Sequence, residues 1–168
     1  MKARFLLSCV LGGLLFSSCG YHLGGLKPAY MEDMHTFCVE MFANNTLQPS
    51  VGVYMTTNMT NTLQTDGTYR LAPRNEADFV VKGAVKSIQR TSLTADTLDS
   101  YISSQIGVIV EVEYTVLDRK TGKVITSGVE TADGAYFNQS GSTISAMDSA
   151  LFYATNRAAE KIMLDITS

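Results

Sequence analysis

The sequence predicts an α+β domain in which two helices pack on one face of a mostly antiparallel sheet. Apolar residues recur at helical spacing in two segments, 51–63 and 142–166, and they alternate with other residues over 102–117. Turn residues at 118–122 then join this long strand to another extended segment. Two helices that each carry one apolar face can together cover one face of such a sheet.

The first predicted elements are a strand and a helix. Residues 35–42 are rich in strand formers, and residues 44–46 (Asn-Asn-Thr) favour a turn. Ser50 is predicted to be the helix N-cap, and Asp66-Gly67 ends the helix. An apolar stripe repeats every four residues, which predicts core packing in preference to a ligand surface. Its members are Val51, Met55, Met59 and Leu63.

Four more strands and a second helix follow. The predicted strands are 68–71, 79–88, 102–117 and 123–131, and the helix is 142–166. Residues 90–100 are polar and predict a loop. In the longest strand, apolar residues take the even positions from Ile106 to Val116, so one sheet face is expected to be buried and the other wetter. The predicted element order is β-α-β-β-β-β-α.

The N-terminus predicts export and lipidation. Lys2 and Arg4 precede an apolar stretch at 5–16 that is too short to span a membrane. The run Phe16-Ser17-Ser18-Cys19 resembles a lipobox, which directs a lipid onto the sulfur of Cys19 and cleavage before it. The alternative is a plain cleaved signal that leaves Cys19 as an ordinary thiol.

We therefore divide the chain of 168 residues into three parts. They are a signal peptide at 1–18, a lipidated linker at 19–30 and a single domain at 31–168. Such a domain is long enough to bury a core without disulfides or metals. The formal charge is −3, and it falls to about −5 when Lys2 and Arg4 leave with the signal. An acidic chain does not suggest general nucleic-acid binding.

The sequence contains no catalytic constellation. His22 and His35 lack the partners of nucleophilic catalysis, and there is no glycine-rich phosphate loop. Glu111 and Glu113 are interpreted as solubilising the open face of the sheet rather than as an acid–base pair. His35 and Cys38 would supply only two metal ligands. We predict a protein that is not an enzyme and has no metal or cofactor.

Five cations are candidates for a phosphate-binding site. Lys86 and Arg90 end a predicted strand, and Arg119, Lys120 and Lys123 cluster at a predicted hairpin tip. Basic side chains at such positions can hold phosphates through charge-assisted hydrogen bonds. The alternative interpretation is a solvated turn with lysines that only improve solubility.

Several segments, taken in order, resemble the LptE family of lipopolysaccharide-assembly lipoproteins. They are residues 19–25 (CGYHLGG), 42–46 (FANNT), 67–71 (GTYRL) and Ala77-Asp78 before a strand that carries Gly83. The resemblance covers nearly all of the chain after the signal. It implies a non-enzymatic lipoprotein of the outer membrane that faces the periplasm, plugs the barrel of a partner, LptD, and assists delivery of lipopolysaccharide to the outer leaflet.

The resemblance also implies a ligand. Family members are thought to bind lipopolysaccharide through basic residues near one end of the sheet, which makes the same five cations the candidates here. They are Lys86, Arg90, Arg119, Lys120 and Lys123. A second hypothesis is a periplasm-facing lipoprotein that binds and activates a cell-wall synthase, with the same signal and the same α+β build.

Overall fold

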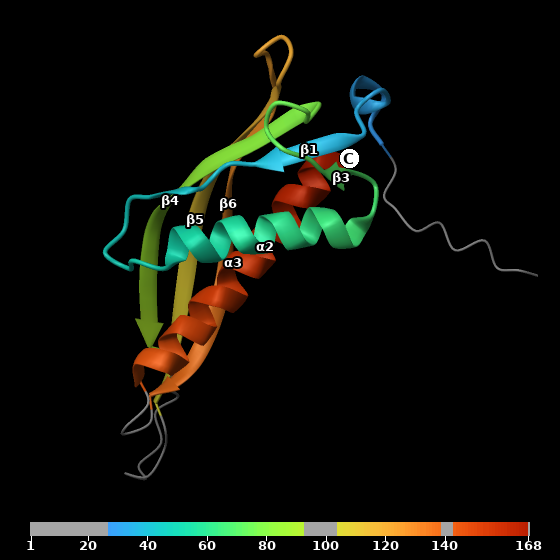
Figure 1. Ribbon diagram of the computed structural model, residues 1–168. Helices are drawn as coiled ribbons and strands as arrows, with labels where there is room; N and C mark the ends of the chain where they lie inside the picture. The colour runs from blue at the N-terminus through green and yellow to red at the C-terminus, as the bar shows by residue number, and fades with distance from the viewer. Residues whose placement is uncertain (1–26, 93–103, 139–142, 168) are drawn as a thin grey trace, which may run out of the picture.

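The computed structural model describes residues 27–92, 104–138 and 143–167, and its elements confirm the predicted α+β class (Figure 1). A 3-10 helix, η2 (Ala29–Met31), precedes the first strand. The strands are β1 (Thr36–Val39), β2 (Ala43–Asn44), β3 (Arg70–Leu71), β4 (Phe79–Ser92), β5 (Ser104–Asp118) and β6 (Val124–Asn138). The α-helices are α2 (Val51–Asp66) and α3 (Thr143–Thr167). The predicted signal peptide, Cys19 and much of the predicted 90–100 loop lie outside the described residues.

The strands form one sheet in the order β3-β1-β4-β5-β6, and β2 also pairs with β4. The long strands β4, β5 and β6 are antiparallel, whereas β1 and β2 run parallel to β4 and β3 runs parallel to β1. The strand predicted at 123–131 continues to Asn138, because β6 pairs with β5 as far as Ser104. Residues 132–138 have no clear strand pattern, so the partner strand determines their conformation.

The segment before α2 differs from its prediction in two places. The strand predicted at 35–42 ends at Val39. The Asn44 backbone pairs with Val85 as part of β2, while its side-chain Oδ1 accepts the Thr46 amide at 2.9 Å, which is the turn chemistry expected at 44–46. The interruption lets Phe42 turn into the core, where it packs on Gly83. A Cβ atom at Gly83 would lie 2.5 Å from the Phe42 ring and 2.2 Å from the Glu113 carbonyl oxygen, so only glycine fits there.

Ser50 occupies the predicted N-cap position of α2, but the capping hydrogen bond expected from its side chain is not formed. Ser50 has helical dihedral angles. Its carbonyl instead accepts the Tyr54 amide at 3.0 Å. Gly67 ends α2 in the left-handed conformation (φ 76°), as the sequence predicted for Asp66-Gly67.

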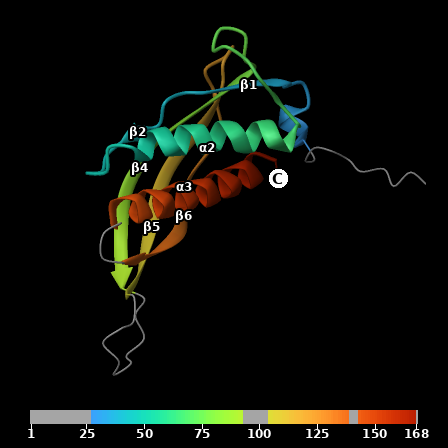
Figure 2. The same cartoon turned by 60° about the horizontal axis from the view of Figure 1, so that its bottom comes forward.

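The core lies between the two helices and one face of the sheet. Figure 2 shows α2 and α3 side by side in front of the strands. The α2 stripe is buried, and so is the α3 stripe from Leu151 to Ile166, whereas Ile144 at the start of the predicted stripe is 82% exposed. The even-numbered residues of β5 from Val108 to Val116 face the two helices. Asn58 of α2 ties the helices together, because its amide donates to the Phe152 carbonyl at 3.0 Å and to Thr155 Oγ1 at 2.9 Å.

Two cations of α3 are directed at the edge of the sheet. Lys161 Nζ donates to the Thr131 carbonyl at 2.6 Å, and Arg157 contacts the Asp133 carboxylate at 2.8 Å and its carbonyl at 3.3 Å. Both carbonyls belong to β6, the edge strand, whose unpaired backbone groups would otherwise face solvent. Arg157 and Lys161 are therefore occupied on the β6 side of the helix.

Candidate functional site

The five cations predicted from the sequence fall into two groups at opposite ends of the sheet. The β4–β5 register places Phe79 beside Asp118 and Arg90 beside Val108. Eleven residues along β4 therefore separate the hairpin end from Arg90, which is about 36 Å at the usual rise per residue. Figure 1 shows the β5–β6 hairpin at one end of the molecule and the tip of β4 at the other. The structure does not bring the five residues together.

The hairpin group contains one cation that is used internally. The Arg119 side chain donates from Nε to the Ala77 carbonyl, and its amide donates to the Asp78 carbonyl at 3.0 Å. Lys120 Nζ lies 3.6 Å from Asp78 Oδ1 but is largely exposed. Lys123 is exposed and forms no ion pair with any described residue. Of the three, Lys123 and Lys120 can reach a ligand without breaking the fold.

Asp78 is the residue that positions this hairpin. Its Oδ2 accepts hydrogen bonds from the His35 amide (2.9 Å), the Thr36 amide (3.1 Å) and Thr36 Oγ1 (2.9 Å). The bond from the His35 amide lowers the pKa of Asp78 most, burial opposes it, and the Thr36 bonds and the charge of Lys120 lower it further. Asp78 thus remains ionised and joins β1, β4 and the hairpin.

The second group lies along β4. Lys86 follows Val85 at a β-bulge and forms an ion pair with Glu113 at 3.0 Å, while Arg90 is exposed and unpaired among the described residues. The two side chains border a hollow of about 520 Å³, whose other side is the loop at 45–48 with exposed Leu47. This hollow combines free positive charge with an apolar surface.

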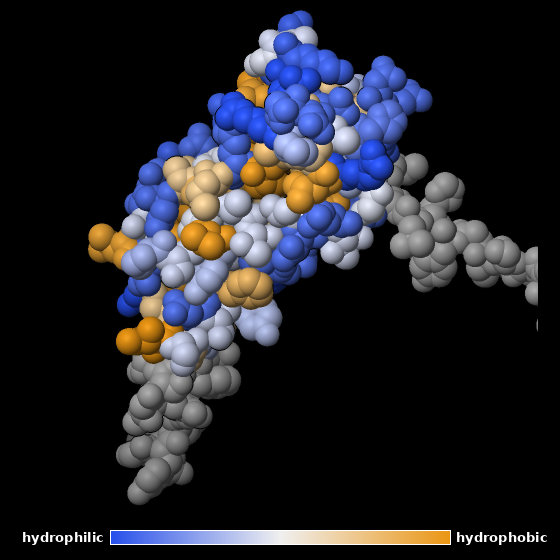
Figure 3. Space-filling view, in the orientation of Figure 1, coloured by the Kyte–Doolittle hydropathy of each residue, from blue (hydrophilic) through white to orange (hydrophobic). Residues whose placement is uncertain are grey.

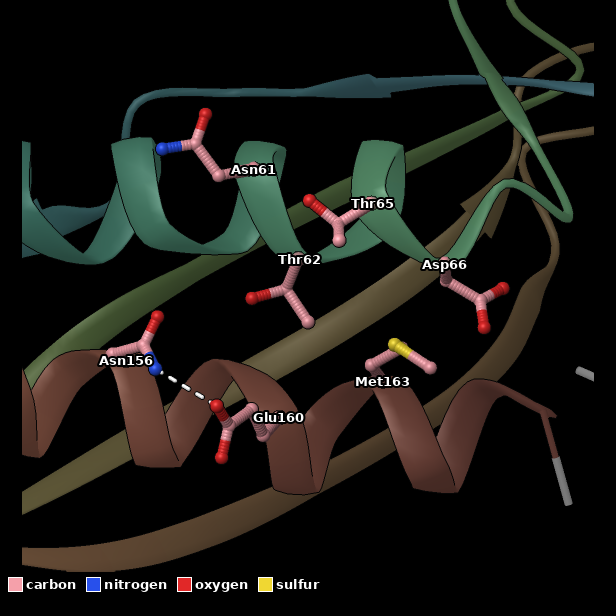
Figure 4. Close-up of a pocket in the computed structure, with 7 residues that line it drawn as sticks. All are labelled: Asn61, Thr62, Thr65, Asp66, Asn156, Glu160 and Met163. Carbon is pink, nitrogen blue, oxygen red and sulfur yellow. Dashed lines mark hydrogen bonds between the residues drawn. The ribbon is translucent and has the colours of Figure 1, made fainter. Parts of the chain in front are cut away.

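The seam between α2 and α3 holds two further hollows that the sequence analysis missed. The first, about 270 Å³, is lined by Tyr54, Asp148, Ser149, Phe152 and Tyr153. The second, about 370 Å³, is lined by Asn61, Thr62, Thr65, Asp66, Asn156, Glu160 and Met163 (Figure 4). Within each helix these residues are three or four positions apart and lie beside the buried stripe. That spacing in the sequence could have predicted a groove between the two helices.

Cys38 and His35 do not form a metal site in this part of the chain. No three His, Cys, Asp or Glu residues within 27–92, 104–138 and 143–167 are placed to hold a metal ion. The Cys38 thiol is half-buried, and burial followed by the nearby charge of Glu40 raises its pKa. No helix in these ranges is both long and apolar enough to cross a membrane.

Solved structures of bacterial proteins, two of them described as lipoproteins, share this fold. PelC from Paraburkholderia phytofirmans, a dodecamer, is 21% identical with a TM-score of 0.55, over 86% of this chain and 96% of that chain. A putative lipoprotein from Caulobacter crescentus is 15% identical (TM-score 0.52; 78% and 87% covered). A minor lipoprotein from Acinetobacter baumannii is 13% identical (TM-score 0.52; 80% and 91% covered). At these identities the likeness shows the fold alone.

The family is shown by a different comparison. No curated protein matches the chain. The model of the family described as "LptE: Lipopolysaccharide-assembly" matches residues 34–166, from just before β1 almost to the end of α3. This match confirms the resemblance stated from the sequence, and LptE proteins are non-enzymatic lipoproteins that sit at the outer membrane. The chain therefore belongs to the LptE family of lipopolysaccharide-assembly lipoproteins.

Proposed function

We propose that this chain is lipidated at Cys19, faces the periplasm from the outer membrane, and partners an LptD-like β-barrel as its plug. In that role it assists the transport of lipopolysaccharide to the outer leaflet and contacts lipopolysaccharide itself. The observation that carries the proposal is the family match over residues 34–166. The lipobox-like run ending at Cys19 supports the anchor.

The length of the sheet is compatible with a plug. β5 and β6 contain 15 residues each, which corresponds to about 50 Å of extended chain. The apolar band of an outer-membrane barrel is only about 25 Å tall. A sheet of this length can extend through a barrel and still present one end to the periplasm.

The exposed cations support contact with lipopolysaccharide, whose lipid head carries phosphates. Arg90 and Lys123 have no ion-pair partner among the described residues, and Lys86 and Lys120 form only exposed pairs. The net charge of the chain is negative, so the contact has to be local, through charge-assisted hydrogen bonds. Because the two groups lie at opposite ends, each is a separate candidate.

Binding of the unlipidated domain to purified lipopolysaccharide tests the two groups. Lys86→Glu with Arg90→Glu, and Lys120→Glu with Lys123→Glu, are compared with Arg70→Glu, which reverses an exposed cation on β3. We expect at least one pair to weaken binding about tenfold or more, and we expect added salt to weaken the wild type, since exposed charges are screened over about 10 Å at 0.1 M. Equal binding by all variants would remove both groups from the mechanism.

Capture of the full-length protein from detergent-solubilised membranes tests the partnership. An outer-membrane β-barrel that co-purifies at fixed stoichiometry is the expected result. A cell-wall synthase in its place would favour the alternative hypothesis, in which the same domain activates that enzyme.

A further inference from the structure

We propose that the seam between α2 and α3 is the docking surface for the barrel partner, and that its two hollows receive arginine or lysine side chains of that protein. The inference rests on the proposed function and adds the face that is used and the chemistry of the surface that meets it. Neither the family match nor the predicted cations assign any role to this seam.

The charged side chains that line the two hollows of the seam are all carboxylates. Asp66, Asp148 and Glu160 line the hollows, and none of them forms an ion pair with a described residue. α2 contains no lysine or arginine. The two cations of α3, Arg157 and Lys161, are both bound to β6. The carboxylates of the seam are therefore uncompensated within the described chain.

The first hollow combines a carboxylate with aromatic rings. The Tyr54 and Phe152 rings meet edge to face with centroids 5.9 Å apart, and the Phe152 and Tyr153 centroids are 6.4 Å apart. Tyr153 is 66% exposed and Asp148 lies one helical turn before Phe152. A ring face beside a carboxylate is an arrangement that recognises a guanidinium or ammonium group by cation–π attraction and charge.

The second hollow has a mostly apolar lining that carries several oxygen acceptors. Figure 4 shows Asp66 and Thr65 from α2 and Asn156, Glu160 and Met163 from α3 around one space. Asn156 Nδ2 donates to Glu160 Oε1 at 2.8 Å, which holds that carboxylate in place. Carboxylate and hydroxyl oxygens on several sides of a space suit the five N–H donors of an arginine.

The two hollows lie at different heights along α3. Asp148 and Glu160 are twelve residues apart, which is about 18 Å along the helix axis and about a third of a turn around it. Between them, the hydrogen bonds from Asn58 to Phe152 and Thr155 close the seam. The partner is thus expected to present two cationic side chains at least about 18 Å apart, with apolar side chains against the exposed aromatic rings.

The same charge distribution excludes two other occupants. The phosphates of lipopolysaccharide would be repelled by the carboxylates of the seam. Exposed cations without an ion pair to a described residue lie instead on strands or their turns, at Arg70, Lys82, Arg90 and Lys123. A second copy docked symmetrically would place acidic seam against acidic seam. Figure 3 shows this helical side with its paler and apolar residues, while strongly hydrophilic residues gather toward the hairpin end.

The test measures the affinity of full-length, lipidated protein for its purified barrel partner in detergent. Asp66→Lys with Glu160→Lys reverses one hollow, and Tyr153→Ser removes an exposed ring of the other. The matched controls are Glu76→Lys, an exposed carboxylate that lines neither hollow, and Val129→Ser on β6, which is 55% exposed. We expect each seam variant to weaken binding about tenfold or more, with controls at the wild-type value, and we expect added salt to weaken the wild type.

Each other outcome overturns the inference in a distinguishable way. If both seam variants bind the barrel with wild-type affinity, the seam is not the docking surface, although the partnership still holds. If the wild-type chain binds no barrel, both the docking surface and the partnership are refuted. Self-association that the seam variants abolish, measured by light scattering, would identify a second copy as the occupant. Thermal melting checks the folding of each variant, and Glu160→Gln, which keeps the size of the side chain, replaces the double reversal if that variant unfolds.

Discussion

Asp78 shows how one partly buried carboxylate organises several segments. It accepts hydrogen bonds from His35 and Thr36 at the start of β1, precedes β4, and lies beside Lys120 of the hairpin. Its backbone carbonyl also accepts the Arg119 amide. No local turn specifies the parallel pairing of β1 with β4. This pairing starts at Asp78, whose hydrogen bonds hold the beginnings of both strands together.

Replacing Asp78 with alanine is expected to destabilise the protein by roughly 1.5–3 kcal/mol, because amide donors lose a charged acceptor. The lowered pKa means that this stabilisation is complete above the ordinary carboxyl pKa of about 4 and is lost as the pH falls through the folded-state pKa. Denaturant unfolding between pH 7 and 3 should therefore show the wild-type advantage shrinking in acid. Asp33→Ala, an exposed neighbour, serves as the control, and a constant difference at every pH would contradict the role assigned to Asp78.

At the scale of elements, α3 contributes the most to the core and also protects the sheet edge. Its apolar stripe from Leu151 to Ile166 is buried against β5, β6 and α2, and Arg157 and Lys161 cover backbone carbonyls of β6. Tyr114 of β5 donates its hydroxyl to Asp165 at 2.8 Å and so joins the sheet to the end of the helix. One helix thus stabilises the domain and limits strand addition at its long edge.

Leu151→Ala and Ile162→Ala are each expected to cost about 2–5 kcal/mol in the free energy of unfolding, because both side chains are buried between α3 and its neighbours. Leu164→Ala changes the same helix at a position that is 61% exposed and should stay within about 0.5 kcal/mol of the wild type. Urea unfolding measures all three. A midpoint for Leu151→Ala that matches Leu164→Ala would mean that the stripe packs elsewhere.

For the whole molecule, the proposed contacts with the membrane, with lipopolysaccharide and with the barrel partner use three separate surfaces. The lipid anchor precedes the domain, the free cations lie on the sheet at its two ends, and the acidic seam lies on the helical side. Opposite charge on different faces permits an anionic lipid and a cationic protein surface to be bound at the same time. Such a division suits a component that holds a partner while it handles lipopolysaccharide.

The anchor itself is tested by Cys19→Ser. Each buried acyl methylene contributes about 0.8 kcal/mol, so several acyl chains hold a protein firmly on a membrane. The variant is expected to be released from membranes or to remain uncleaved, as seen by fractionation and intact-mass spectrometry. An unmodified Cys19 in the wild-type protein, or a mature N-terminus at another residue, would refute lipidation.

The sequence alone determined the features that depend on local periodicity. The stripes of α2 and α3, the alternation of β5 and the turn at Gly122 follow from residues close together in the chain, because one buried face imposes its period on the sequence. Ordered motifs spread along the chain were enough for the LptE resemblance.

Only the tertiary structure decided which distant residues meet. Pairing with β5 extended β6 by seven residues, Phe42 packing on Gly83 divided the first strand, and the antiparallel register of β4 and β5 separated Arg90 from Lys123. The sequence does not distinguish Asn58 from the other polar residues of α2, but in the structure its side chain forms hydrogen bonds that join α2 to α3. These outcomes depend on contacts between residues far apart in sequence, and such contacts leave no periodic signal in either segment.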